Sequence, residues 1–238
     1  MSTSFFLPTR KGSQRINDKN TRSFAEYPGG IFELKLRQLI DSTQFDEIIV
    51  STNDENCLRI AADLVGSNPL FRIIRRPDQL CLDTTPLKDL IYYAGEICTA
   101  EDILWGHVTT PMAIAKDYDL IVQTFSNQKL EGYDSLVTVL PVKNFFIQPF
   151  TGHFINSVDK SMQWPRTQDL QEIYEINHVA FLAPREIYLQ HGNRIGKRPW
   201  YYPMSKLRSI DIDWEEDFLI AEALYEKFYG AKGDSLGF

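Results

Sequence analysis

Residues 4–20 read Ser-Phe-Phe-Leu-Pro-Thr-Arg-Lys-Gly-Ser-Gln-Arg-Ile-Asn-Asp-Lys-Asn, and this stretch decides the fold. Its first five residues, 4–8, form an apolar run that predicts a buried strand. A polar and basic loop comes directly after it. In an open α/β sheet, ligands bind beyond the carboxyl ends of the strands, where such a loop lies. The stretch therefore predicts the first strand of an α/β sheet and a binding site at its end.

The rest of the chain alternates between strand-like and helix-like segments, which is typical of βαβ units and a largely parallel sheet. We expect further strands at residues 47–52, 70–74, 103–108, 135–140, 176–182 and 208–213. We expect helices at residues 31–40, from Asp54 onward, from Pro86 onward, near residues 114–125, and at the carboxyl end, where Trp214, Phe218, Ala221, Tyr225 and Phe228 share one stripe. The predicted fold class is α/β, with a mixed but mostly parallel sheet flanked by helices.

The pattern changes between residues 141 and 175. This segment is rich in aromatic residues, contains Pro149 and Pro165, and shows no helical period. It predicts an insertion of hairpins and loops that caps the site or forms an oligomer contact. The chain of 238 residues is otherwise expected to form one domain, residues 1–238.

The composition excludes several classes of protein. With 43% hydrophobic and 24% charged residues, the chain is neither disordered nor fibrous. A net charge of −7 argues against general binding of nucleic acid, which needs a broad basic surface. The charge is uneven, however, because residues 1–22 carry five cationic side chains against Asp18 alone. This local excess of positive charge predicts an anion site.

The cysteines and the amino-terminal segment indicate a cellular compartment. Cys57, Cys81 and Cys98 are odd in number and widely spaced, which is typical of free thiols in a reducing environment. The apolar run near the amino end is too short for a signal peptide or a membrane span. We therefore expect a cytoplasmic protein that does not bind membranes.

The basic loop contains the groups that a polyphosphate site needs. Gly12 lets the backbone approach a ligand closely, Ser13 can donate a hydrogen bond, and Arg10, Arg15 and Lys19 can bind phosphate. Neither common nucleotide-binding glycine motif, G-x-x-x-x-G-K-[ST] or G-x-G-x-x-G, occurs in the chain. The loop therefore predicts a different phosphate-binding device, with a solvated surface loop as the alternative.

Two aspartates lie near the other end of the chain. Asp211 and Asp213 are separated by one residue on an expected strand, so both carboxylates would share one face. Mg²⁺ commonly binds one or two protein carboxylates together with substrate phosphates and water. The pair predicts a Mg²⁺ site, although an exposed strand face before a helix is the alternative reading of an isolated Asp-x-Asp.

Further motifs lie between the loop and the aspartate pair. They are Val-Ser-Thr-Asn-Asp at residues 50–54, Arg-Pro-x-x-Leu-x-x-Asp-Thr at 76–84, Val-Thr-Thr-Pro at 108–111, Arg-x-Gln at 166–168, and Asn177. Together with the loop, they resemble in order and spacing the acylneuraminate cytidylyltransferases, which are the CMP-sialic acid synthetases and their relatives for other nonulosonic acids. The resemblance covers nearly the whole chain. It implies a Rossmann-like nucleotide-diphospho-sugar transferase fold and a homodimer.

The resemblance also implies a reaction and its residues. CMP would pass from CTP to the anomeric hydroxyl of an acidic nine-carbon or related sugar, with Mg²⁺ required and pyrophosphate released, to supply surface polysaccharide or glycoconjugate synthesis. Arg10, Lys19 and Asp211 would be catalytic, and Asp211 and Asp213 would bind the metal. The nucleotide would contact Arg10, Gly12, Ser13, Arg15, Lys19, Asn20, Asp83 and Thr84. The sugar would contact Gln14, His107, Thr109, Thr110, Arg166, Gln168, Asn177 and Phe181, with Arg166 on its carboxylate.

The departures from the family cluster at the sugar positions. Gln14, His107, the pair at residues 112–113, His178 and Phe181 stand where the family has Lys, Gln, Leu-Arg, Gly and Tyr. We therefore expect the same reaction on a different acidic sugar, with N-acetylneuraminate a poor substrate. His107 would be either a polar contact or a packing residue. Two alternatives stay open: a nucleotidyltransferase for ketodeoxyoctulosonate or another sugar, and a non-catalytic nucleotide-binding homologue.

Overall fold

The computed structural model describes residues 2–158 and 164–230, and in these residues seven strands form one sheet in the order β3-β2-β1-β4-β6-β5-β7. The strands are β1 (Thr3–Pro8), β2 (Glu47–Thr52), β3 (Phe71–Arg75), β4 (Asp102–Gly106), β5 (Ser135–Val142), β6 (Ile173–Pro184) and β7 (Pro199–Pro203). β1 to β4 are mutually parallel and β7 is parallel to β5, whereas β6 runs antiparallel to both of its neighbours. The expected mixed, mostly parallel sheet is confirmed.

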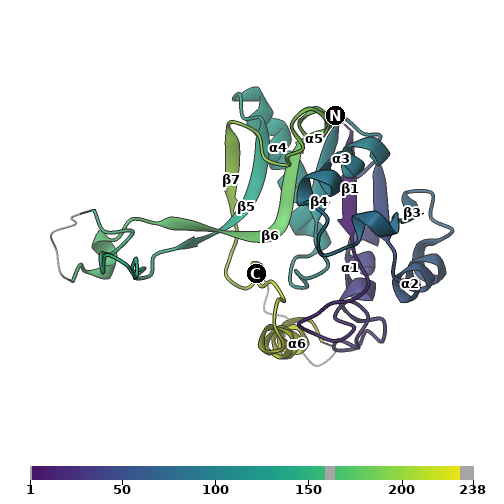
Figure 1. The fold of residues 1–238 in the computed structure, drawn as a ribbon, viewed down its shortest axis with the longest axis horizontal. Coiled ribbons are helices and arrows are strands. Elements are labelled where there is room, and N and C mark those ends of the chain that lie inside the picture. Colours follow the sequence, from purple (N-terminus) through teal and green to yellow (C-terminus); the bar gives the residue numbers. More distant parts are fainter. Residues whose placement is uncertain (1, 159–163, 231–238) are drawn as a thin grey trace.

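Helices cover both faces of this sheet (Figure 1). They are α1 (Gly30–Ile40), α2 (Glu55–Val65), α3 (Leu87–Ile97), α4 (Ala115–Leu130), α5 (Arg185–His191) and α6 (Glu215–Tyr229), with short 3₁₀ turns η1 (Asp78–Leu80) and η2 (Thr167–Asp169). Side chains alternate across β1, so Phe5 and Leu7 enter one core while Phe6 enters the other. Burying each such side chain stabilises the fold by roughly 1.5–3 kcal/mol.

Local signals start two helices where the sequence predicts. The Asp54 carboxylate accepts a hydrogen bond from the Asn56 amide at 2.9 Å and caps α2. Pro86 precedes α3, where its fixed backbone angle suits a helix start. None of the helices in residues 2–158 and 164–230 has the length and apolar character needed to cross a bilayer.

The expected strand at residues 208–213 is wrong. Residues 206–209 form a turn and residues 210–213 are irregular, and Ile212 donates one backbone hydrogen bond to the Thr109 carbonyl at 2.8 Å. The edge of the sheet is formed instead by β7, which the sequence analysis missed together with α5. β7 begins and ends with proline, which argues against a central strand but is tolerated at a sheet edge.

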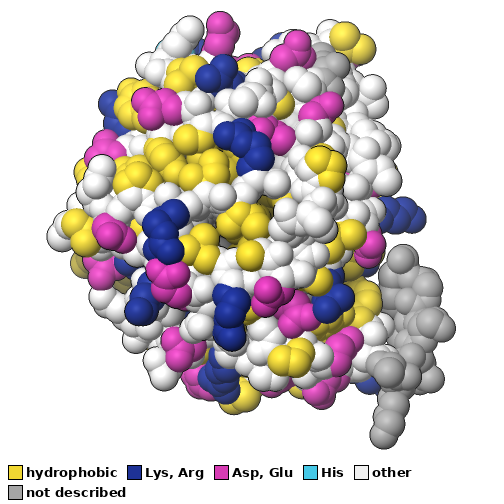
Figure 2. Space-filling model, turned by 90° about the vertical axis from the view of Figure 1, so that its right-hand side faces the viewer, with side chains coloured by type: hydrophobic (Ala, Val, Ile, Leu, Met, Phe, Trp, Pro, Cys, Tyr) yellow, Lys and Arg dark blue, Asp and Glu magenta, His cyan; other side chains and the backbone are white. Residues whose placement is uncertain are grey.

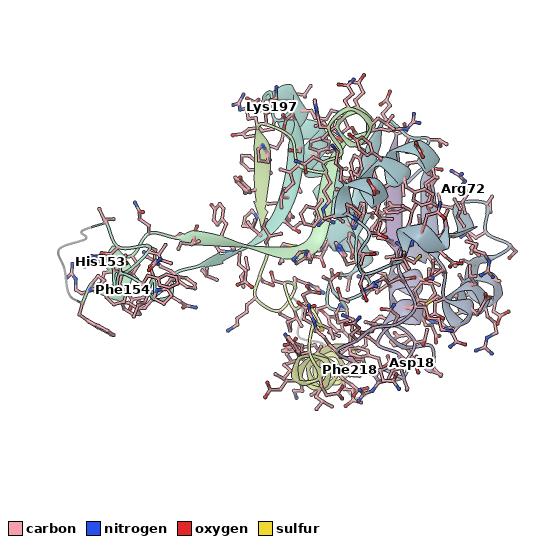
Figure 3. All side chains as sticks on the ribbon, viewed as in Figure 1. Asp18, Arg72, His153, Phe154, Lys197 and Phe218 are labelled. Carbon is pink, nitrogen blue, oxygen red and sulfur yellow. The ribbon has the colours of Figure 1, made fainter. Side chains whose placement is uncertain are left out.

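Residues 141–175, here called the arm, project from the body of the protein (Figure 1). The ends of β5 and β6 form its stem, with Pro141 paired to Tyr174 and Val142 paired to Ile173. Phe145, Phe154 and Trp164 pack together in its outer lobe, at ring distances of 5.3–5.7 Å. Figure 3 labels Phe154 at that distal end. The predicted insertion is therefore a two-stranded stem with a looped lobe, of which residues 159–163 lie outside the described residues.

The loop between β1 and α1 lies beside α6, so an early and a late segment of the sequence meet there (Figure 1). Phe24 packs edge-on against Phe218 with ring centroids 5.4 Å apart. Arg22 forms an ion pair with Glu215 at 2.6 Å. Figure 3 shows Asp18 of this loop near Phe218. These contacts fix the loop between β1 and α1 against α6, which directly follows the aspartate pair in sequence.

Candidate active site

A cavity of about 510 Å³ lies at the carboxyl ends of β1 and β4. It is lined by Pro8, Thr9, Arg10, Ser13, Gln14, Arg15, Lys19, Asn20, Asp83, His107, Val108, Thr109 and Asp213. The basic loop and the aspartate segment, almost 200 residues apart in sequence, therefore meet at one site. This is the crevice where α/β sheets of this kind bind ligands.

Arg10 is held at the cavity wall by Asp83. Its Nη2 lies 2.5 Å from Asp83 Oδ1, and its Nη1 donates to the Cys81 carbonyl at 3.2 Å. Gln14 donates to the other Asp83 oxygen at 2.5 Å. Arg10 and Asp83 are both about half exposed, so water screens this pair and its net contribution to stability is small, about 0–1 kcal/mol. The guanidinium can therefore exchange Asp83 for a phosphate at little cost.

Arg15 forms the corresponding contact on the opposite wall. Its Nη1 lies 2.9 Å from Asp213 Oδ1, and its guanidinium lies 4.8 Å from the centre of the Trp214 ring. Stacking on an aromatic face fixes a guanidinium without using its hydrogen-bond donors. Trp214 thus orients Arg15 towards the cavity. The predicted place of Trp214 on the buried stripe of the last helix was wrong, because Trp214 is 60% exposed at the start of α6, whereas Phe218, Ala221 and Tyr225 are buried.

Lys19 and Asp211 lie deeper than the two arginines. Lys19 Nζ donates to the Ile212 carbonyl at 2.9 Å. Burial lowers the pKa of Lys19, although the nearby charges of Asp213 and Asp211 act in the opposite direction. Burial also raises the pKa of Asp211, against the effect of a hydrogen bond from the Thr109 side chain. Asp211 Oδ1 is buried and has no hydrogen-bond partner among the described residues.

This donor set fits a hard divalent cation. A buried carboxylate oxygen without a partner is costly unless something binds it. Arg10, Arg15 and Lys19 are matched by Asp83, Asp211 and Asp213, so the site alone has no excess positive charge for a polyphosphate. Within the described residues no group of three or more His, Cys, Asp or Glu side chains is arranged to hold a metal. Two carboxylates that leave the remaining positions to phosphate and water are what Mg²⁺ commonly uses.

Other predicted nucleotide residues shape the loop. Ser13 lines the cavity, and Asn20 donates a long hydrogen bond of 3.4 Å to the Arg10 carbonyl. Gly12 adopts a φ of +85°, which favours glycine, and nothing lies within 4 Å of where a side chain would begin. Gly12 therefore permits the turn but does not line the cavity. Thr84 is exposed beside Asp83 and is also outside the lining.

Both ring nitrogens of His107 are occupied within the protein. Trp105 Nε1 donates to His107 Nε2 at 3.1 Å, so the other nitrogen, Nδ1, carries the hydrogen and donates to the His178 carbonyl at 2.8 Å. Burial, and to a lesser extent the charge of Arg194, lowers the pKa of His107 to about 3, so the ring is neutral. His107 lines the cavity but offers it only carbon edges, as a packing histidine would.

The replaced sugar positions touch one another. The rings of His107, His178 and Phe181 lie 5.6–6.1 Å apart. His178 has a φ of +58°, a conformation that glycine adopts freely and that costs a side chain about 1–2 kcal/mol. Phe181 is buried and lies under the Arg194 guanidinium at 3.7 Å. Three of the departures from the family pattern therefore form one contiguous group, whereas Gln14 contacts Asp83 and residues 112–113 are buried in the core.

Several predicted sugar residues do not reach the cavity within one chain. Arg166 lies in the exposed arm and pairs with Asp169 at 2.7 Å, and the Gln168 carbonyl accepts from Lys143 at 3.1 Å. Asn177 is buried and donates to Ser209 Oγ at 2.9 Å. It therefore supports the backbone just before the aspartate pair. Thr110 is likewise fully buried behind Thr109.

The sequence analysis missed Lys35, which lies behind the site. Its ammonium group is fully buried and donates to the carbonyls of Thr110 and Ala113. The signal was its position, since residue 35 falls three residues after Phe32 and four before Leu39, on the face of α1 that packs into the core. A lysine on an apolar helix face is unusual, because charged side chains are rarely fully buried.

A second cavity of about 510 Å³ lies between α1 and α2 and contains none of the predicted residues. Its charged lining residues are Glu33, Arg37, Arg59 and Asp63, so the two signs balance. Figure 2 shows the molecule from the side of β3 and α2, where basic and acidic side chains are interspersed. Such a mixed surface has no continuous basic stripe of the kind that nucleic acid binding needs.

Comparison with known proteins identifies similar chains. A family model described as cytidylyltransferase matches residues 5–141. An N-acylneuraminate cytidylyltransferase of Streptococcus agalactiae is 26% identical over 216 residues, which cover 90% of this chain and 51% of that protein. This chain thus spans about half the length of that relative. A pseudaminic acid cytidylyltransferase of Campylobacter jejuni is 22% identical, with 92% of this chain and 94% of that protein covered.

One solved structure has the same fold. The CMP:2-keto-3-deoxy-manno-octonic acid synthetase complexed with CTP superposes with a TM-score of 0.63 at 12% identity, covering 94% of this chain and 98% of that chain. At this identity the likeness concerns the fold. It agrees with the α/β sheet and the nucleotide-transferase architecture that the sequence predicts.

Proposed function

Because this chain belongs to the cytidylyltransferase family, we propose that it transfers CMP from CTP to the anomeric hydroxyl of an acidic nonulosonic sugar and releases pyrophosphate. The observation that carries this proposal is the single cavity in which Arg10 and Lys19 face the segment of Asp211 and Asp213. In the proposed reaction a sugar oxygen forms a bond to the α-phosphorus of CTP, and the bond from that phosphorus to the bridging oxygen breaks.

The cations of the loop would bind and orient the triphosphate. Arg10 and Arg15 exchange their exposed carboxylate partners for phosphate oxygens, with which a guanidinium forms two parallel hydrogen bonds. Lys19 contributes a charge from the partly buried floor. Catalysis of phosphoryl transfer depends mainly on such positioning and on charge stabilisation, because the protein has little covalent chemistry to perform.

Asp211 and Asp213 would hold Mg²⁺ in this proposal. The buried, unpartnered Oδ1 of Asp211 supports it, as does the balance of cations and carboxylates around the cavity. When bound, the metal would neutralise negative charge on the phosphates. Thr109 stabilises the ionised form of Asp211 and so keeps this carboxylate available as a ligand.

We further propose that the accepted sugar differs from N-acetylneuraminate. His107 has no free ring nitrogen, and Phe181 is buried and carries no hydroxyl. The cavity wall at residue 107 therefore offers carbon edges where the family pattern has an amide, while Phe181 lies behind the wall without a hydroxyl to extend to it. A sugar that places a hydroxyl here would lose a hydrogen bond, which makes a less polar substituent the better fit.

The proposed assembly is a homodimer in the cytoplasm. Phe150 and Trp164 in the arm are 92% and 71% exposed, and large apolar side chains gathered on a projecting segment are typical of an interaction surface. The three cysteines are free thiols, as a reducing compartment would maintain. Light scattering should give a mass twice the 27.5 kDa of one chain, and a monomer would contradict the dimer.

A matrix of substrates tests the reaction. The purified chain is offered each of the four nucleoside triphosphates with Mg²⁺, and each of N-acetylneuraminic, legionaminic, pseudaminic and ketodeoxyoctulosonic acids. We expect pyrophosphate release with CTP and an acidic sugar, and slow turnover of N-acetylneuraminate. Preference for another nucleotide would overturn the proposal. Binding of CTP and Mg²⁺ without turnover of any acidic sugar would identify a non-catalytic nucleotide-binding homologue.

A further inference from the structure

Side chains hold four consecutive backbone carbonyls just beyond β4. Lys35 Nζ donates to the Thr110 carbonyl at 2.9 Å and to that of Ala113 at 3.4 Å. Gln38 Nε2 donates to the Pro111 carbonyl at 2.7 Å, and Arg208 Nη1 donates to the carbonyl of residue 112 at 2.6 Å. An irregular segment is thereby fixed as firmly as a regular element, because every carbonyl in it has a partner.

Lys35 provides two of these bonds from a fully buried position. Its third hydrogen bond reaches the Tyr118 hydroxyl at 2.7 Å, so three oxygens match the three donors of an ammonium group. The nearest acidic group, Asp117, accepts instead from the Ile114 amide at 2.9 Å and lies 3.3 Å from Arg208. Among the described residues, Lys35 thus has hydrogen bonds but no ion pair.

The held segment is continuous with the metal side of the proposed site. Thr109 lines the cavity directly before it, and its carbonyl accepts the Ile212 amide at 2.8 Å. A line of contacts therefore runs from Lys35 through residues 110–113 to Thr109 and on to the backbone between the two aspartates.

We propose that Lys35 is a positioning residue for nucleotidyl transfer, which fixes residues 110–113 so that Thr109 can hold the aspartate segment in its productive geometry. This inference rests on the proposed function. A packing role alone would be met by any side chain of similar volume, whereas positioning requires hydrogen-bond donors. The two roles therefore separate when the donors are removed and the volume is kept.

Two substitutions make this separation. Lys35→Met keeps an unbranched side chain and removes all donors, whereas Lys35→Gln keeps two donors without the charge. The matched control is Lys129→Met, because Lys129 is a partly buried lysine of the same body. It pairs with Asp102 at 2.9 Å, at the amino end of β4 and so at the end of the strands opposite the cavity. Each variant is compared with the wild type for kcat, KM for CTP, and thermal midpoint.

Two further readouts do not depend on turnover. Hydrogen–deuterium exchange monitors peptides that cover residues 107–114 and 209–213, and Mn²⁺ electron paramagnetic resonance measures metal binding in the presence of CTP. For Lys35→Met we expect faster exchange in both peptides, weaker Mn²⁺ binding, and a kcat reduced about ten- to a hundredfold. Lys35→Gln should recover part of each. Lys129→Met should lower the thermal midpoint and leave kcat and these peptides unchanged.

Wild-type exchange, Mn²⁺ binding and kcat in Lys35→Met would overturn the inference. A loss in Lys35→Met that Lys35→Gln does not partly restore would also overturn it, since the donors would not then be the cause. Should Lys35→Met fail to fold, Lys35→Gln against Lys129→Met decides alone, with an intermediate kcat expected. If the wild type turns over no sugar, the proposed function fails, while exchange and Mn²⁺ binding still decide the role of Lys35.

Discussion

The predicted site residues lie in two different environments, which are the cavity in the body of the protein and the exposed arm. In the cavity, Lys19 and the aspartate segment are joined by contacts between residues 193 positions apart in sequence. In the arm, Arg166 pairs with Asp169 only three residues away, and both groups are on the surface. The difference teaches that the nucleotide side is assembled by the fold itself, whereas the arm residues are presented outward.

A second contrast lies between the residues that match the family pattern and those that depart from it. The loop residues Arg10 and Lys19 match the family and line the cavity. The departures at His107, His178 and Phe181 touch one another beside it. A pocket wall can change chemistry as a unit when its members contact one another, because each substitution alters the space left for the next.

The largest expected effect comes from a substitution at the cavity, Asp211→Asn. Asp211→Asn should reduce kcat on the order of a hundredfold or more, because a neutral amide is a poor ligand for a hard cation. Its free energy of unfolding should stay equal or rise, since burial already disfavours the charged carboxylate. Pyrophosphate release and urea denaturation measure the two quantities. Wild-type kcat in a folded Asp211→Asn protein would remove the metal role.

A smaller effect is expected when a substitution in the arm is compared directly with one at the cavity. Arg166→Ala should raise KM for the acidic sugar about tenfold and leave KM for CTP unchanged, whereas Arg10→Ala should raise KM for CTP. Neither change should measurably shift the free energy of unfolding, because both arginines form exposed ion pairs that water screens. Steady-state kinetics with each substrate varied checks this. An unchanged sugar KM in Arg166→Ala would exclude the arm from sugar binding.

The last prediction concerns how the stability of the fold depends on pH. Burial lowers the pKa of Lys35 from 10.5 to about 7, with Asp117 acting in the opposite direction. Between these values the unfolded chain binds a proton that the folded chain does not, so raising the pH stabilises the fold. The stability of the wild type relative to Lys35→Met should therefore rise from pH 7 to pH 10, by at most about 1.4 kcal/mol per unit, and stay flat below pH 6.

The other groups around Lys35 do not obscure this slope. Burial raises the pKa of Tyr118, which faces the ammonium from α4, and the pKa of His107 is lowered to about 3, so both stay neutral over this range. Urea denaturation at several pH values gives the difference between the two proteins. A difference that does not vary with pH would show that Lys35 keeps its proton in the folded state.

Patterns along the chain predicted most of the body. The apolar run of β1 and the helix-start signals at Asp54 and Pro86 are local signals, and they were confirmed. The strand expected at residues 208–213 was wrong, because an alternating Ile-Asp-Ile-Asp run is compatible with any extended backbone. β7 was missed because proline is tolerated only in an edge strand, and the sequence alone does not show that β7 lies at the edge of the sheet.

The candidate site was predicted in its residue types but not in its connections. The basic loop and the aspartate pair stand out in the sequence because charge and spacing are local properties. Lys35 did not, although its place on the apolar face of α1 was visible. What it touches depends on where the segment after β4 crosses that helix.

By itself, the sequence determined the α/β class, the charge of the basic loop, and the pair of carboxylates, because hydrophobic period, charge and residue type are carried by neighbouring residues. Only the tertiary structure decided that Arg15 pairs with Asp213, that His107 has no free nitrogen, and that Arg166 lies outside the cavity of its own chain. These outcomes depend on how distant segments are placed. They result from the packing of the sheet and its helices, which no short window of sequence specifies.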